Sequence, residues 1–133
     1  MRSLSPNHYE RAFENWLIDN HISYTRSDER RRLGPSEGSV KNFDFLLCLQ
    51  TGRQVIVEVK GRTFEGASLR DLSGLECWVT ADDIRSLQVW REALGAGHEA
   101  VFTFAYRVVH ADVDFNGHEP ITVGLDRYVF FCI

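Results

Sequence analysis

The stretch Gln54–Lys60 is the segment that most restricts the fold of this chain, because it is apolar on both faces of an extended strand. Successive side chains of a strand point to opposite faces. Here both faces receive apolar groups, from Val55, Ile56, Val57 and Val59. Such strands are typical of sheets that other elements cover on each side. The sequence thus predicts the α/β class, with a mixed central sheet flanked by helices.

Two helices are indicated by apolar periodicity and by capping residues. The first covers Pro6–Asn20 after the N-cap Ser5, and its apolar stripe comprises Tyr9, Ala12, Phe13, Trp16 and Leu17. The second covers Ala81–Leu94 between the N-cap Thr80 and the terminating Gly95, with a stripe of Ile84, Leu87, Trp90 and Leu94. Each stripe predicts a helix that packs one face against the sheet.

The strands are predicted from apolar runs that are rich in β-branched and aromatic residues. They are Ile22–Arg26, Phe43–Leu49, Gln54–Lys60, Glu76–Val79, Ala100–Val109 and Arg127–Ile133. Gly61–Gly74 is expected to be a polar connection. The predicted order is α-β-β-β-(β)-α-β-β, with Glu76–Val79 in brackets, in one domain that spans residues 1–133.

The composition is that of an ordinary globular domain, with 44% hydrophobic and 26% charged residues among 133. The longest uncharged apolar runs, Ala100–Tyr106 and Tyr128–Ile133, fall far short of the ~20 residues that a membrane helix needs. The first residues are too polar for a secretory signal. Three cysteines without a Cys-x-x-Cys argue against a disulfide framework or a zinc ribbon. We therefore expect a cytoplasmic protein that has no membrane partner.

The net charge of −4 is unevenly distributed. Residues 1–62 contain ten Lys and Arg against eight Asp and Glu, whereas residues 63–133 contain five against eleven. Positive charge gathers at Arg26, Arg30, Arg31, Arg32 and Lys41. A short arginine run by itself is most simply a solvated loop, so its function depends on what lies beside it.

Asp44, Glu58 and Lys60 are the charges that interrupt the two central apolar runs. Glu58 and Lys60 are two residues apart and share one face of their strand. A three-residue loop Gln50–Gly52, with Gly52 in the left-handed region, would pair Asp44 with Glu58, whereas a two-residue turn would pair Asp44 with Val59. Cross-strand neighbours lie about 5 Å apart, so the first register lets two carboxylates hold one divalent ion.

The chemistry of this trio favours a metal-assisted reaction. Two adjacent carboxylates repel unless a cation neutralises them, and oxygen ligands suit magnesium or manganese. Such a metal can polarise a phosphodiester and lower the pKa of a bound water. Lys60 could orient that water or stabilise the developing charge, and Glu10 from the first helix could complete the metal shell. The alternative is a half-exposed hairpin with solvated charges, but charges within doubly apolar strands call for a compensating partner.

The remaining notable side chains receive structural interpretations. Trp16, Trp78 and Trp90 are expected to pack in the core and not to stack on nucleic-acid bases. Cys48 and Cys132 fall within predicted strands and are expected to be small buried hydrophobes.

Asp44 followed by Glu58-Val59-Lys60 resembles the PD-(D/E)XK nuclease signature, with Phe43 in place of its proline. Within that superfamily the chain looks most like the archaeal Holliday-junction resolvases, over about residues 7–131. The segment His8–Glu14 also matches the motif of an uncharacterised bacterial group, the H-Y-E-x-A-F-E proteins. The resemblance implies a restriction-endonuclease-like fold with an α-β-β-β-α-β core.

The resemblance also implies a Mg²⁺-dependent DNA endonuclease, in which Mn²⁺ can substitute and branched or junction DNA is a candidate substrate. Its metal ligands would be Asp44, Glu58 and the Val59 carbonyl, with Glu10 as an additional acid and Lys60 as the catalytic lysine. A homodimer is compatible with the resemblance, and no small-molecule cofactor is expected. Ser39 lies near the position of the resolvases' active-site serine.

Contacts to DNA phosphates are expected from the basic residues of the first half, since such contacts supply most sequence-independent affinity. The candidates are Arg26, Arg30, Arg31, Arg32, Lys41 and Arg62. Two departures from the resolvases are the acidic second half and the longer loop Ser27–Gly38. The alternative function is therefore a catalytically inactive module with this fold that binds nucleic acid or protein.

Overall fold

The computed structural model describes residues 7–26, 43–69 and 77–133, and these contain two helices and six strands. In chain order the elements are α1 (His8–Asp19), β1 (Ser23–Arg26), β2 (Phe45–Cys48), β3 (Gln54–Phe64), α2 (Ala81–Leu94), β4 (His98–Val108), β5 (Ile121–Val123) and β6 (Asp126–Cys132). The strands form one sheet in the order β1-β2-β3-β4-β6-β5. Only the β3–β4 pair is parallel, so the predicted mixed sheet with flanking helices is confirmed.

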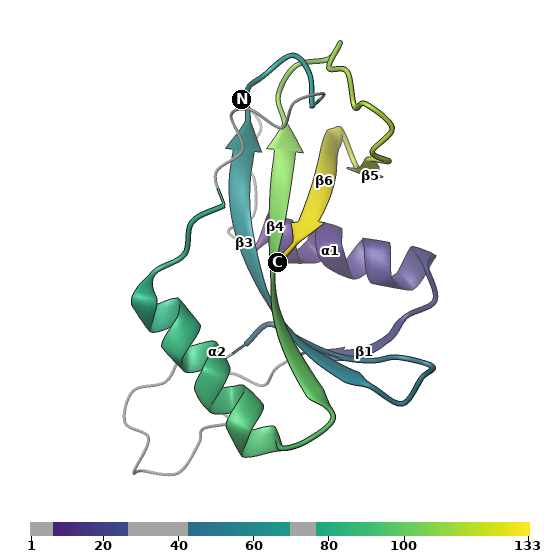
Figure 1. Cartoon of the computed structure of the whole chain (residues 1–133). Coiled ribbons are helices and arrows are strands. Elements are labelled where there is room, and N and C mark those ends of the chain that lie inside the picture. The colour runs from purple at the N-terminus through teal and green to yellow at the C-terminus, as the bar shows by residue number, and fades with distance from the viewer. Residues whose placement is uncertain (1–6, 27–42, 70–76) are drawn as a thin grey trace.

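The two long strands β3 and β4 run side by side through the centre of the sheet, and the two helices lie away from each other (Figure 1). On the α1 side, Phe13 and Leu17 are buried against β2 and β3 at Phe45, Val55 and Val57. Burial of each such side chain stabilises the fold by about 1.5–3 kcal/mol. The α1 stripe is therefore what attaches this helix to the sheet.

On the opposite face, α2 buries Leu87 and Trp90 against Phe43 and Ile56. Adjacent residues of β3 thus contact different helices, because Ile56 packs towards α2 while its neighbours pack towards α1. Both faces of β3 are apolar because a helix covers each of them, as the sequence predicts.

Helix α2 has the bounds that its capping residues predict. The Thr80 side chain accepts the Asp83 backbone N–H at 3.0 Å, and the Asp83 carboxylate accepts the Thr80 N–H at 3.1 Å, which forms a capping box. Gly95 follows the helix with a φ of +92°, a conformation that favours glycine. Its apolar stripe is narrower than expected, because Ile84 is 42% exposed.

Strand β3 is longer than expected, since Gly61–Phe64 continue it instead of starting the polar connection. These four residues pair with β4, from Gly61 opposite Ala105 to Phe64 opposite Val108. Gly61 also lies against the Tyr9 ring, where an added Cβ would overlap the ring atoms. The parallel pairing with β4 and the close approach of α1 both involve distant parts of the chain. The polarity of residues 61–64 therefore could not predict them.

One predicted strand is absent at residues 77–79, and one observed strand, at residues 121–123, was not predicted. The described part of the predicted strand Glu76–Val79, residues 77–79, is not a strand. The short strand β5 instead pairs with β6. Cys48 and Cys132 are exposed and not buried, since each is the last residue of its strand.

The predictions for Ser5 and Pro6 lie outside the described residues, as do those for Glu76 and for the loop after Arg26. Within the described parts of the chain, neither helix is long and apolar enough to cross a membrane.

Candidate active site

The β2–β3 hairpin has the register that brings Asp44 opposite Glu58. Phe45 pairs with Val57 and Cys48 with Gln54, so one further step places Asp44 at the level of Glu58. At the loop, the Leu49 N–H donates to the Arg53 carbonyl at 2.9 Å. Gly52 has a φ of +88°, as the three-residue loop requires. The predicted register is therefore confirmed.

Asp44 is held where the backbone ladder between β2 and β3 ends. Its own N–H donates to the Val57 carbonyl at 2.9 Å, and its Oδ2 accepts the Val59 N–H at 2.7 Å. The side chain thus takes the place of a backbone acceptor for β3. This leaves the carboxylate half-buried and fixed beside Glu58.

Glu58 is half-buried, and its pKa is raised to about 9. The largest cause is desolvation of the carboxylate, followed by a hydrogen bond with Asp44 and by the Asp44 charge. The charge of Lys60 acts in the opposite direction, and that of Asp83 adds to the increase. At neutral pH Glu58 therefore retains its proton, which can serve its hydrogen bond with Asp44.

Lys60 lies on the same face of β3 as Glu58 and forms an ion pair with the first turn of α2. Its Nζ is 3.1 Å from Asp83 Oδ2, and the two side chains are only 20% and 5% exposed. Asp83 is the same residue that closes the capping box of α2. It therefore connects the start of the helix to the lysine of the candidate site.

Asp83 belongs to this cluster, although its sequence pattern does not mark it as a site residue. The spacing Thr80-x-x-Asp83 predicts a helix cap, and that interpretation is correct. A second role could not be found locally, because Lys60 is 23 residues earlier in the chain. Only the packing of α2 on β3 brings the two side chains together.

Glu10 lies on α1, which packs on the other face of the sheet. Its Oε1 accepts a hydrogen bond from Arg26 at 2.6 Å, and the Arg26 guanidinium also lies 3.6 Å from Glu14. Arg26 covers the Phe45 ring at 5.0 Å from its centroid. The structure thus brings Asp44, Glu58 and Lys60 together, and it pairs Glu10 with Arg26 at the α1 side.

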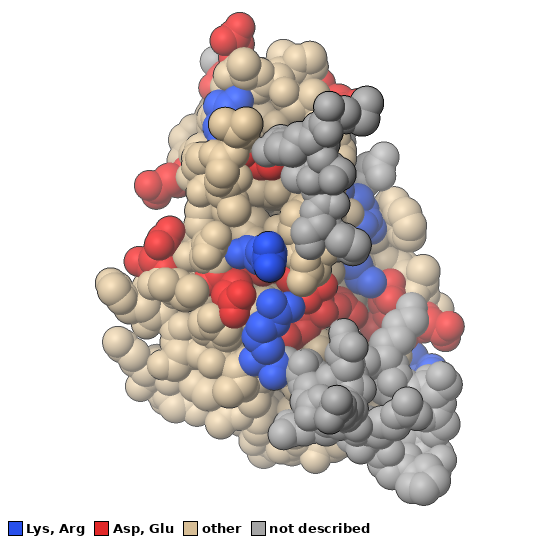
Figure 2. Space-filling model, turned by 180° about the vertical axis from the view of Figure 1, so that it is seen from behind, with Lys and Arg blue, Asp and Glu red and all other residues tan. Residues whose placement is uncertain are grey.

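The basic residues proposed to contact DNA have different surroundings. On the face seen from behind the view of Figure 1, acidic and basic side chains of the described residues lie next to each other (Figure 2). The guanidinium of Arg62 donates to the Gly61 and Trp78 carbonyls at 2.9 and 2.8 Å. The other candidates lie outside the described residues: Arg30, Arg31, Arg32, Ser39 and Lys41.

The donor set for a metal is the Asp44–Glu58 pair. Among the described residues, no three His, Cys, Asp or Glu side chains are grouped so that they could hold an ion. A half-buried carboxyl pair still suits a hard divalent cation, because the cation can take the place of the Glu58 proton. The backbone carbonyl of Val59, which follows Glu58, is the further oxygen expected from the sequence.

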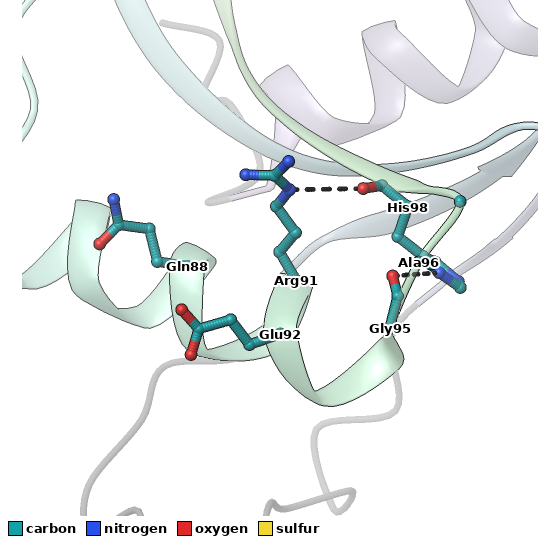
Figure 3. Close-up of a pocket in the computed structure, with 7 residues that line it drawn as sticks. Gln88, Arg91, Glu92, Gly95, Ala96 and His98 are labelled. Carbon is teal, nitrogen blue, oxygen red and sulfur yellow. Dashed lines mark hydrogen bonds between the residues drawn. The ribbon is translucent and has the colours of Figure 1, made fainter.

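A surface cavity of about 520 Å³ lies at the C-terminal end of α2, whereas Asp83 is in its first turn. Gln88, Arg91, Glu92 and His98 are among the residues that line it (Figure 3). Some of its polar groups bond to one another. Arg91 Nε donates to the His98 carbonyl at 3.4 Å, and His98 Nδ1 lies 3.3 Å from the Gly95 carbonyl oxygen. The cavity is therefore separate from the carboxylate pair.

Comparison of the chain with protein-family models, with curated proteins and with solved structures found no significant match to any of them.

Proposed function

We propose that the protein is a metal-dependent endonuclease of the PD-(D/E)XK type that hydrolyses phosphodiester bonds of DNA. The observation that carries the proposal is the meeting of Asp44 and Glu58 across the β2–β3 hairpin, with Lys60 on the same face. Two carboxyl groups held side by side can bind a hard divalent cation in place of the Glu58 proton. The pattern Asp…Glu-x-Lys therefore coincides with a three-dimensional cluster.

The arrangement of elements supports the same proposal. Helix α1, strands β1–β3, helix α2 and strand β4 follow the α-β-β-β-α-β order of a restriction-endonuclease-like core. The carboxyl pair lies at the end of the antiparallel β2–β3 ladder that is away from the hairpin loop.

Asp44, Glu58 and the Val59 carbonyl are the groups that would hold Mg²⁺ or Mn²⁺. The bound ion supplies a Lewis acid that polarises the phosphodiester and lowers the pKa of water. Lys60 contributes a positive charge for the phosphate oxygens, and Asp83 holds that ammonium at 3.1 Å. Glu10 is paired with Arg26 on the α1 face of the sheet, so it would add a further acid only if it left Arg26 and reached the opposite face.

The test is cleavage of linear, nicked and branched DNA with Mg²⁺, Mn²⁺ or EDTA. Asp44→Asn and Glu58→Gln keep the size of each side chain but remove a metal ligand, and Lys60→Ala removes the ammonium. Each should reduce cleavage at least 100-fold, in keeping with the loss of one electrostatic stabiliser. Asp82→Asn is the matched control, because Asp82 is 75% exposed next to Asp83. Metal-independent cleavage, or full activity of Asp44→Asn, would exclude the proposed mechanism.

The second candidate is a catalytically inactive module of the same fold that binds nucleic acid or protein. The ion pair of Lys60 with the nearly buried Asp83 favours it, since this pair engages the charge that catalysis would need. For this function, binding would be independent of divalent metal and unchanged by Lys60→Ala.

A further inference from the structure

Trp78 is exposed beside the candidate site, contrary to its expected place in the core. It precedes the N-cap of α2 by two residues and is 59% exposed. Trp90, in comparison, is 2% exposed. Indoles contribute large apolar areas when buried, so an indole with most of its surface in water loses that stabilisation.

Arg62 holds Trp78 in this exposed position. Its Nη2 donates to the Trp78 carbonyl at 2.8 Å, and its guanidinium carbon lies 4.6 Å from the centroid of the Trp78 ring. The same guanidinium is 5.6 Å from the ring of Phe104, which is 1% exposed. Trp78 is thus attached to the core through a cation–π contact, which covers one face of its ring.

The position of Arg62 on β3 shows where Trp78 lies relative to the carboxylate pair. Glu58, Lys60 and Arg62 alternate along one face of β3, and at 3.3 Å per residue Arg62 is about 13 Å from Glu58. Asp83 approaches the same face from α2 and contacts Lys60. Trp78 therefore lies on the side of the sheet that carries the proposed chemistry, next to Arg62 and beyond Lys60 from the carboxyl pair.

We propose that Trp78 stacks on an unpaired nucleobase of the DNA strand whose phosphodiester is cleaved. This inference rests on the proposed nuclease function and specifies its substrate as DNA with unpaired nucleotides beside the cleaved bond. Every base has a π-face, and stacking on an aromatic side chain is tolerant of sequence. Inside a duplex both faces of a base are covered by its neighbours, so within a strand an unpaired nucleotide is what offers a face to the indole. Arg62 beneath the ring adds a positive charge that suits the adjoining phosphate.

The first experiment measures binding without cleavage, by fluorescence anisotropy of labelled oligonucleotides in EDTA and in Ca²⁺. Short single strands and the matching duplex are compared for the wild type, Trp78→Ala, Trp78→Leu and Trp78→Phe. Leu125→Ala is the control, because Leu125 is 84% exposed in the β5–β6 turn and its loss removes a comparable apolar group. Thermal melts verify that each variant folds.

Trp78→Ala and Trp78→Leu should weaken single-strand binding about 5- to 150-fold, and Trp78→Phe should retain most of the affinity. Duplex affinity and the Leu125→Ala control should remain unchanged. Tryptophan emission of the wild type should fall on addition of single strands, and that quenching should disappear in Trp78→Phe. An abasic nucleotide scanned along the strand should reduce wild-type affinity at one position and have no effect there in Trp78→Ala.

The inference is overturned if Trp78→Leu binds single strands like the wild type, if duplex binding falls equally, or if the wild type binds no single strand. If Trp78 instead binds a protein partner, we expect that the wild type binds no single strand. The proposed nuclease function has a separate readout, which is cleavage. Metal-dependent cleavage that persists in Trp78→Ala without a change in strand preference would overturn the stacking role alone. Binding that depends on Trp78 in a protein that cleaves nothing would overturn the nuclease alone.

Discussion

At the scale of single residues, the protonation of Glu58 is the property that most distinguishes this protein from an ordinary hairpin. A solvated glutamate on a strand would be ionised at neutral pH. Burial and the neighbouring Asp44 instead raise the Glu58 pKa to about 9. The folded protein therefore holds a proton there that the unfolded chain releases at much lower pH.

This difference predicts a pH-dependent stability in EDTA. Between about pH 4.5 and 9 the native state binds more protons at Glu58 than the unfolded state, so stability should decrease as pH rises. One such proton accounts for up to about 1.4 kcal/mol per pH unit. Glu58→Gln, which mimics the neutral carboxyl group, should flatten the slope in urea unfolding at several pH values. A variant with the wild-type slope would show that another group is responsible.

At the scale of elements, α2 stabilises the fold and also holds Lys60, and two variants separate these roles. Thr80→Ala removes one half of the capping box and should cost about 1 kcal/mol of unfolding free energy, with the Lys60–Asp83 pair retained. Asp83→Ala removes the cap and leaves the largely buried Lys60 without this partner, which should cost roughly 2–3 kcal/mol. Urea unfolding measures both.

The same two variants should differ in cleavage. Asp83→Ala should lower kcat, whereas Thr80→Ala should leave it unchanged after correction for the unfolded fraction. Asp83→Glu, which keeps a carboxylate, should recover part of the loss. Equal effects of Thr80→Ala and Asp83→Ala on kcat would mean that α2 acts only through stability.

The packing of α1 on β3 requires a glycine at position 61. Any Cβ there would overlap the Tyr9 ring, so Gly61→Ala should destabilise the protein by about 1–3 kcal/mol. In a Tyr9→Ala background the added methyl group has room, and the further cost of Gly61→Ala should largely vanish. Thermal or urea unfolding of the four proteins gives this coupling. Independent effects of the two changes would contradict the contact.

At the scale of the whole molecule, all described strands belong to one sheet, and one helix packs on each face of that sheet. Strands β3 and β4 share eleven paired positions, although α2 separates them in sequence. Residues from β3 take part in packing with each helix. Neither half of the chain therefore contains a complete core.

This arrangement predicts cooperative unfolding of a single domain. Far-ultraviolet circular dichroism and the combined emission of Trp16 and Trp90, which both pack against the core, should change at the same urea concentration. Trp78→Phe removes the exposed fluorophore and simplifies the emission signal. Two separated transitions would indicate two folding units and would contradict the single-domain prediction.

Local sequence was sufficient wherever a structure depends on residues close together in the chain. Gly52 determines the loop that places Asp44 opposite Glu58, because only a left-handed residue there permits the three-residue turn. Thr80 and Gly95 likewise define both ends of α2. Turn geometry and capping act over three or four residues, which is the range that a sequence pattern reports.

The tertiary structure alone decided the surroundings of these elements. It extended β3 through its pairing with β4, placed Asp83 on Lys60, paired Glu10 with Arg26 and left Trp78 exposed above Arg62. Each of these contacts joins residues that lie more than ten positions apart in the chain. These contacts form only when the helices pack against the sheet. The free energy of that packing comes from many side chains that are distant in sequence, so no single segment encodes it.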